Sequence, residues 1–412
     1  MTRGVANFNL NWRVWEERVT GVLPPSVRRN MHIDLAAATL FGPFIASLTF
    51  LPVVMRRLGA PPEWLAFYAA QNFIGFLFTA VSVWAMPRRH GLLRFAIFFW
   101  TLSRGSFLLV AVLSGAQSLI WLTLWFWLME SFPMPAYTRL MQAAYPARSR
   151  GRVISLIRVG MSTANLAVTP LIGWLLDTAG HQVLYPLGSV FALVSVAVFS
   201  RLRFTEADFT ESPPASGAGL WHLAIADRRF GLYLGALTLF GVGLLSSAAL
   251  LPLVQVDRLG LTYGEIGGLS VVQSAFSLLG YMVWGRLIDR RGAVWAIRLV
   301  FLIAGVIPLS YWLASAGWML APAFAALGLV NAGMDVGMLT TVMQLAPAER
   351  LGEYSALQTT VLGLRGLAAP FIGVWLVQGL GWSFPLVFGL GLALILVSVA
   401  LLWRVRGERA AG

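Results

Sequence analysis

The chain has 412 residues, of which 58% are hydrophobic and only 11% are charged, and its mean hydropathy is +0.75. A soluble domain needs far more charge to cover its surface, so we predict an integral membrane protein whose main partner is the lipid bilayer. The net charge is +13, and all thirty basic residues are arginines, most of them in the polar loops, so no nucleic-acid partner is predicted. The absence of cysteine and lysine excludes disulfide, thiol and Schiff-base chemistry.

The chain begins with a polar segment, in which Asn11–Leu23 is predicted to form an interfacial helix ended by Pro24-Pro25, with a flexible tail as the alternative. Twelve apolar runs follow, each about 20 residues long and therefore able to cross a bilayer. They are predicted to be helices, because lipid offers no partner for open backbone groups. The runs cover residues 33–54, 64–86, 95–114, 119–143, 153–175, 183–200, 231–252, 266–286, 294–314, 318–343, 354–376 and 383–403.

A long polar stretch divides the twelve runs into two sets of six. We predict an N-terminal segment (1–30), a six-helix bundle (31–200), a linker (201–229) with a short helix at Leu220–Ala226, a second bundle (230–404) and a tail (405–412). Arginines are concentrated in alternate loops, whereas the other side holds only Arg56, Arg57 and Arg258. The positive-inside rule then predicts a multi-pass protein of the cell (inner) membrane with both termini and the linker in the cytoplasm.

The two halves of the chain repeat each other. Leu51–Gly91 and Leu251–Gly292 share Leu-Pro, Arg-Leu-Gly, an apolar span and a basic turn that ends in glycine, with one gap. PARSRGRVISL (146–156) likewise matches PAERLGEYSAL (347–357), and TPLIG (169–173) matches APFIG (369–373). Two similar halves in a very apolar chain predict a bundle with a substrate site between the halves, as in a solute carrier.

One motif in the second half resembles a family signature. Residues 285–292, GRLIDRRG, resemble the G-x-L-x-D-R-x-G signature of the major facilitator superfamily. The resemblance implies an all-α membrane protein with twelve transmembrane helices in two pseudo-symmetric six-helix bundles. It also implies a cytoplasmic gate formed by Gly285, Asp289, Arg290 and Gly292 that latches the two halves together, although the motif could instead tie only its own loop.

Ionisable groups inside apolar spans are expensive, so each is a functional candidate. Glu130, Asp335 and Asp34 are the candidates for a proton-coupling carboxylate, although Asp34 is more simply explained as the N-cap of the first helix. Arg104 and Arg365 are two deeply placed bases. The candidates for substrate binding are Arg365, Asn331, Asn165, Arg104, Gln71, Asn72, Gln358, Tyr137 and Trp125.

The repeat predicts one polar layer near the middle of the membrane. Glu130 should lie level with Asn165, and Asn331 level with Arg365, so that the first half contributes an acid and the second half a base. We hypothesise that Glu130 carries the proton and that Arg365 anchors an anionic group or holds Glu130 across the cleft. The alternative is a structural pair between Glu130 and Arg104. Prolines at 133 and 135 predict a break in the helix beside Glu130.

These features predict a secondary active transporter that works by alternating access. The leading hypothesis is a monomeric, proton-coupled exporter of a small hydrophobic or amphipathic compound. Uptake or exchange of an anionic or polar solute is one alternative, and a non-transporting sensor or scaffold on the same fold is another. The chain has no P-loop, H-E-x-x-H or G-x-S-x-G motif, so we predict no enzyme activity, no cofactor and no metal.

Overall fold

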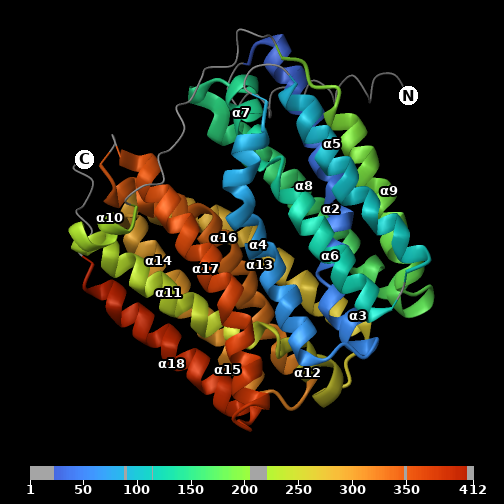
Figure 1. The fold of residues 1–412 in the computed structure, drawn as a ribbon, viewed down its shortest axis with the longest axis vertical. Coiled ribbons are helices and arrows are strands. Elements are labelled where there is room, and N and C mark those ends of the chain that lie inside the picture. The colour runs from blue at the N-terminus through green and yellow to red at the C-terminus, as the bar shows by residue number, and fades with distance from the viewer. Residues whose placement is uncertain (1–22, 88–90, 114, 205–219, 348–349, 406–412) are drawn as a thin grey trace, which may run out of the picture.

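The structure is a computed structural model that describes residues 23–87, 91–113, 115–204, 220–347 and 350–405. The described residues form helices and contain no strand (Figure 1). The first half consists of α2 (Pro25–Leu48), α3 (Leu51–Arg57), α4 (Pro62–Ala85), α5 (Leu92–Gly105), η1 (Ser106–Ala111), α6 (Ala116–Ser131), α7 (Met134–Ala144), α8 (Ala147–Thr178) and α9 (His181–Phe199).

The second half is also built from helices. It consists of α10 (Leu220–Ala226), α11 (Arg228–Ala248), α12 (Leu251–Leu253), the π-helix η3 (Val254–Arg258), α13 (Tyr263–Arg291), α14 (Ala293–Ala304), α15 (Val306–Leu313), η4 (Gly317–Leu320), α16 (Ala321–Leu345), α17 (Leu351–Gln378) and α18 (Phe384–Trp403). Helix α10 has the bounds predicted for the short helix within the linker.

Ten helical segments of the described chain are long and apolar enough to cross a membrane. The other two predicted runs correspond to α4 and to the pair α6–α7. The break between α6 and α7 falls at Phe132-Pro133, as the prolines predicted, because proline cannot donate to the helical hydrogen-bond ladder.

The first helix begins earlier than the apolar pattern indicated. Helix α2 starts at Pro25 with Pro24 as its N-cap, and proline is well suited to the first helical position because its φ angle is already helical. Asp34 therefore lies well inside α2, and the prediction that it caps the helix is wrong. The interfacial helix predicted at Asn11–Leu23 falls outside the described residues except for Leu23.

Figure 1 shows two groups of helices, coloured blue to green and yellow to red. In the first group α2 packs on α8 and α9, and in the second α11 packs on α17 and α18 while α13 packs on α16. The two groups meet where α4 packs on α17 and where α8 packs on α13. The predicted boundaries of the bundles, linker and tail stay predictions, and residues 205–219 and 406–412 lie outside the described chain.

The repeat is present in the backbone as well as in the sequence. Six described glycines have a positive φ angle, and they form three pairs in which the partners are 201 positions apart. The pairs are Gly59 and Gly260 (φ 85° and 61°), Gly91 and Gly292 (86° and 86°), and Gly180 and Gly381 (77° and 67°). A side chain would strain the backbone at each of these turns, so both halves keep glycine where the chain reverses.

The one gap between Leu51–Gly91 and Leu251–Gly292 has a structural counterpart. Leu251–Gly260 is one residue longer than Leu51–Gly59, and it contains the five-residue π-helix η3. A π turn accommodates an extra residue within a helix. The Arg-Leu-Gly sequence shared with the first half begins at Arg258, the last residue of η3.

Candidate functional site

Glu130 forms an ion pair with Arg104 inside the first half. Arg104, on α5, is 6% exposed, and its Nη2 lies 3.0 Å from Oε1 of Glu130 on α6. Ser103 Oγ donates to the other carboxylate oxygen at 3.0 Å, and the guanidinium of Arg104 lies 3.7 Å from the ring centre of Phe41. Of the two partners predicted for Glu130, Arg104 and Arg365, the structure therefore shows Arg104.

Arg365 is held inside the second half, between α17 and α11. It is 8% exposed, and its Nη1 donates to the carbonyl oxygen of Leu237. On the same helix, Gln358 Oε1 accepts a hydrogen bond from Tyr233 at 2.9 Å. The predicted contact between Arg365 and Glu130 is wrong in this structure. Each arginine donates to an acceptor within its own half, while its buried Nε has no hydrogen-bond partner among the described residues.

Two further candidates of the first half are used in packing. Gln71, on α4, is buried and its Nε2 donates to the carbonyl oxygen of Ile120 at 2.9 Å. Tyr137, on α7, packs edge-on against Trp100, with 5.8 Å between the ring centres. These contacts tie α4 to α6 and α7 to α5.

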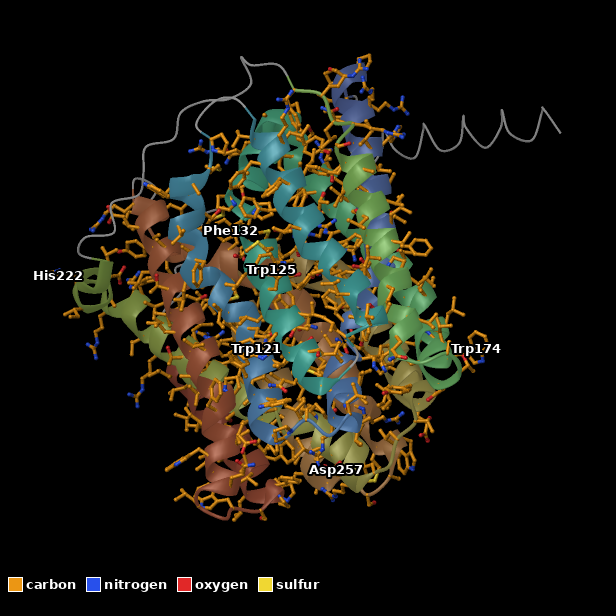
Figure 2. The ribbon with its side chains drawn as sticks, turned by 45° about the vertical axis from the view of Figure 1, so that its right-hand side comes forward. Trp121, Trp125, Phe132, Trp174, His222 and Asp257 are labelled. Carbon is orange, nitrogen blue, oxygen red and sulfur yellow. The ribbon has the colours of Figure 1, made fainter. Side chains whose placement is uncertain are left out.

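The remaining first-half candidates are more accessible. Asn165, on α8, is half-buried, and its side-chain oxygen accepts a hydrogen bond from Thr169 at 3.1 Å. Asn72 is exposed on α4. Trp125 is exposed one turn from Trp121 on α6, and both are labelled in Figure 2. No contact to a substrate can be assigned to these residues, so their roles stay predictions.

Four charged or phenolic groups lie at one level of the molecule, and we call them the charged layer. They are Asp34 on α2, Arg158 on α8, Tyr281 on α13 and Asp335 on α16. Each lies about ten residues, or roughly 15 Å along the helix axis, from one terminus of its helix. That terminus is the first residue of α2 and α8 and the last residue of α13 and α16. We call that end of the molecule the linker end.

The two carboxylates of the charged layer each accept a hydrogen bond from a tyrosine. Tyr281 Oη donates to Oδ2 of Asp335 at 2.5 Å, and Asp335 is exposed, as is Asn331 one turn away on α16. Asp34 is only 3% exposed and accepts from Tyr145 Oη at 2.9 Å. Each carboxylate therefore has a hydroxyl donor within its own half.

Arg158 is the cation of the charged layer. Its side chain is exposed, and it makes no hydrogen bond or ion pair with the described residues. It lies close enough to Asp34 in the first half and to Tyr281 in the second half to interact with both electrostatically. Sequence reasoning did not include Arg158 or Tyr281 in the site. Depth alone does not show that α8 packs on α13, and a tyrosine in an apolar span carries no distinctive signal.

The signature motif forms the turn between α13 and α14. Gly292 ends α13, and the first two backbone N–H groups of α14 donate to Gln344 Oε1 at 2.9 and 3.2 Å. Asp289 and Arg290 are exposed and make no hydrogen bond or ion pair with described residues. A Cβ at Gly285 would meet no atom within 4 Å. The motif thus ties its own loop to α16, and Asp289 does not latch the halves here.

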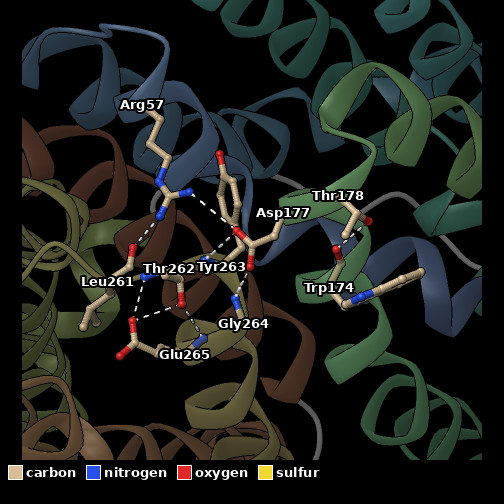
Figure 3. Close-up of polar contacts among 9 residues, drawn as sticks. All are labelled: Arg57, Trp174, Asp177, Thr178, Leu261, Thr262, Tyr263, Gly264 and Glu265. Carbon is tan, nitrogen blue, oxygen red and sulfur yellow. Dashed lines mark hydrogen bonds and ion pairs between the residues drawn. The ribbon is translucent and has the colours of Figure 1, made fainter.

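The two halves are joined at the end opposite the linker end, where Figure 1 shows α3 and α12. Arg57 donates to the carbonyl oxygen of Leu261, lies 3.8 Å from the ring centre of Tyr263 and is 3.9 Å from Oδ1 of Asp177 (Figure 3). Asp177, on α8, accepts from the backbone N–H groups of Tyr263 at 3.3 Å and Gly264 at 2.8 Å. A residue of the first half therefore caps the first turn of α13 in the second half.

That first turn of α13 also carries its own cap. The Thr262 hydroxyl accepts from the Glu265 backbone N–H at 3.1 Å, and Glu265 in turn accepts from the Thr262 backbone N–H at 2.8 Å. This reciprocal pair is a capping box. Because the turn is held from within the second half, Asp177 meets a fixed set of N–H donors.

A second ion pair also joins the two halves at this end, and its two residues occupy equivalent positions of the repeat. Nε of Arg56 donates to both carboxylate oxygens of Asp257 at 3.1 and 2.8 Å, and Nη2 lies 2.6 Å from Oδ2. Asp257 is labelled at the lower end of Figure 2. Two arginines here would repel, whereas arginine facing aspartate attracts. We call Arg56, Arg57, Asp177, Asp257 and Leu261–Gly264 the clasp.

Known structures share this fold. The nucleoside transporter NupG superimposes with a TM-score of 0.70 at 11% identity, over 93% of this chain and 100% of that chain. An auto-inhibited POT family peptide transporter gives 0.70 at 11% identity, over 93% and 98%, and the POT family transporter PepTSo gives 0.66 at 13%, over 91% and 98%. At these identities the likeness shows the fold alone.

The sequence itself carries the family assignment. No curated protein matches it. The profile of the Major Facilitator Superfamily, however, matches residues 33–366 and 256–412. Together with the apolar helices, the twofold repeat and the fold, this match shows a multi-pass membrane protein. The chain belongs to the major facilitator superfamily.

Proposed function

We propose that the protein moves a small solute by alternating access, with its halves rocking about the charged layer. We also propose that the linker end faces the cytoplasm, as the arginine distribution predicts, so that the conformation described here is closed to the outside. Family membership and the fold shared with transporters support a secondary transporter. Export, the predicted direction, stays a prediction.

The observation that carries this proposal is the clasp. In alternating access the halves meet at one end while they separate at the other. Arg56 and Asp257 are 25% and 39% exposed, and ion pairs this accessible contribute about 0.2–1 kcal/mol each. Ion pairs of this energy are strong enough to favour one conformation and weak enough to break when the halves move. At the linker end, Asp289 is available for the complementary latch.

We further propose that Asp335 carries the coupled proton. Its carboxylate is exposed at the charged layer and accepts a hydrogen bond from Tyr281 on α13, which also interacts electrostatically with Arg158 on α8 of the other half. Protonation of Asp335 would remove a negative charge beside Tyr281, at the contact between α13 and α8, and so alter the balance between the halves. Glu130 suits this role less well, because Arg104 and Ser103 already occupy both of its oxygens.

The rocking motion can be tested without knowing the substrate, because the chain contains no cysteine. Arg56→Cys and Asp257→Cys would be cross-linked with a short bifunctional thiol reagent in a chain that also carries Asn331→Cys. An impermeant maleimide should then label Asn331→Cys from the linker side only, and cleavage of the cross-link should restore labelling from both sides.

Exposed His222, on α10, provides the control, since His222→Cys should be labelled from the linker side throughout (Figure 2). A non-transporting scaffold predicts that the cross-link leaves the labelling of Asn331→Cys unchanged. That result would contradict alternating access.

Proton coupling requires a separate measurement. Proteoliposomes with an imposed pH gradient would be exposed to a panel of lipophilic cations, organic anions and sugars. A response that disappears in Asp335→Asn and persists in Glu130→Gln supports the assignment of the proton to Asp335. The opposite result returns the role to Glu130.

A further inference from the structure

Arg158 differs from the other two arginines placed deep in the spans. Arg104 and Arg365 are 6% and 8% exposed, and each donates to an acceptor in its own half. Arg158 lies in the apolar segment Ser149–Thr178, yet it is exposed and makes no hydrogen bond or ion pair with the described residues. A guanidinium in a membrane-spanning segment needs water or an anion as its partner.

The groups around Arg158 leave its donors available. Asp34 on α2 is hydrogen-bonded to Tyr145, and Asp335 on α16 is hydrogen-bonded to Tyr281 on α13. Neither carboxylate lies within the 4 Å of an ion pair with Arg158 among the described contacts. The cation therefore has Asp34 near it in the first half and the hydrogen-bonded pair of Tyr281 and Asp335 near it in the second, and none of these groups occupies its N–H donors.

We infer that Arg158 is the anchor for the anionic group of the transported solute, a carboxylate or a phosphate. This inference rests on the proposed function and adds the chemical class of its substrate. The planar guanidinium presents five N–H donors in a fork that matches two oxygens of a carboxylate or phosphate. Arg158 belongs to α8, which packs on α13 of the other half, so an anion bound there lies between the halves.

Binding to the purified protein tests this assignment directly. The probes are benzoate and succinate as carboxylates, phenyl phosphate and glycerol 3-phosphate as phosphates, and benzamide as the uncharged match of benzoate. Titration calorimetry and thermal unfolding in detergent should detect saturable binding of at least one anion. Benzamide should bind at least about tenfold more weakly than benzoate if carboxylates are the ligand, because it lacks the charge.

The substitutions separate a role in binding from a role in folding. Arg158→Gln should weaken the best anion by about 10- to 100-fold, and Arg158→Lys should retain part of the affinity, because lysine keeps the charge without the fork. Arg152, an exposed arginine on the same helix nearer the linker end, is the matched control, and Arg152→Gln should leave binding unchanged.

The inference is overturned if none of the four anions binds, or if anions bind to Arg158→Gln as tightly as to the wild type. It is also overturned if benzoate is the only anion that binds and benzamide binds equally well. Preference for the carboxylates or for the phosphates identifies which of these two groups the transported solute carries. Labelling of Asn331→Cys uses no anion, so failure of this site and failure of alternating access are distinguished by separate measurements.

Discussion

The two halves share a backbone but not a set of charges. The three pairs of positive-φ glycines and the prolines inside α8 and α17, Pro170 and Pro370, recur at equivalent positions. The buried ion pair of the first half does not recur. At the positions equivalent to Arg104 and Glu130, the second half has Gly305 and Asn331.

This difference separates what the fold requires from what one half has added. Turns and helix bends are needed in both copies, so glycine and proline are kept in both. The ion pair is not needed for the architecture, because the second half folds in the same way without it. The first half uses its charges internally, whereas the second half exposes Asn331 and Asp335 on one face of α16.

The largest expected effect comes from breaking the ion pair. Arg104→Ala should lower the free energy of unfolding by about 3–5 kcal/mol, because Glu130, whose side chain is only 16% exposed, would be left without its cation. Thermal unfolding in detergent would measure the loss. Adding Glu130→Gln should recover part of it. The equivalent change in the second half, Asn331→Ala, should stay within about 0.5 kcal/mol because Asn331 is exposed. Equal losses in the two halves would refute the asymmetry.

Two equivalent glycines provide the next test. A Cβ at Gly373 would collide with the carbonyl oxygen of Ser246 inside the second half, whereas a Cβ at Gly173 would lie 2.7 Å from the carbonyl oxygen of Tyr263 across the halves. Gly373→Ala should therefore cost about 1–3 kcal/mol of folding stability through overpacking. Gly173→Ala should mainly push the halves apart at the clasp.

Unfolding and labelling together distinguish these two effects. Gly173→Ala should increase labelling of Asn331→Cys from the clasp side, with a smaller change in the unfolding temperature than that caused by Gly373→Ala. If Gly173→Ala destabilises the fold as much and leaves the labelling unchanged, the contact at Tyr263 is structural and does not report the separation of the halves.

The smallest effect is expected at the clasp ion pair. Arg56→Asp places two acids opposite each other and should shift the ratio of outside to inside labelling by up to about fivefold, the equivalent of 1 kcal/mol for an exposed pair. The double variant Arg56→Asp with Asp257→Arg reverses the charges and should restore the original ratio. A double variant that behaves like the single one would show that attraction between these residues is not what holds the clasp.

Much of the fold could be predicted from the sequence, because run length, proline position and repeated glycine act locally. The break at Pro133, the helix at Leu220–Ala226 and the membership of the family followed from such signals. The start of α2 was missed, because polar residues at the end of a span do not resemble an apolar run.

The polar layer was predicted less well, for a geometric reason. Counting residues from a turn gives the depth of a side chain, but one residue of error rotates it by about 100° around the helix. Glu130 and Arg365 were placed at one level, yet each points into its own half. The grouping of Arg158 with Tyr281 depends on packing between α8 and α13, which no local signal encodes.

The π-helix η3 has a consequence for how the two copies can differ in length. An inserted residue in an α-helix turns everything after it by about 100°, which would present a different side of the chain to the first half. In η3 a single wide turn contains the insertion, and the turn that follows is kept intact. Equivalent residues are therefore 200 positions apart in the sequence at Leu51 and Leu251, and 201 positions apart at Gly59 and Gly260. The same one-residue step puts Asp257 opposite Arg56. A single insertion in one copy thus coincides with an attraction between two duplicated helical segments, where arginine in both copies would repel.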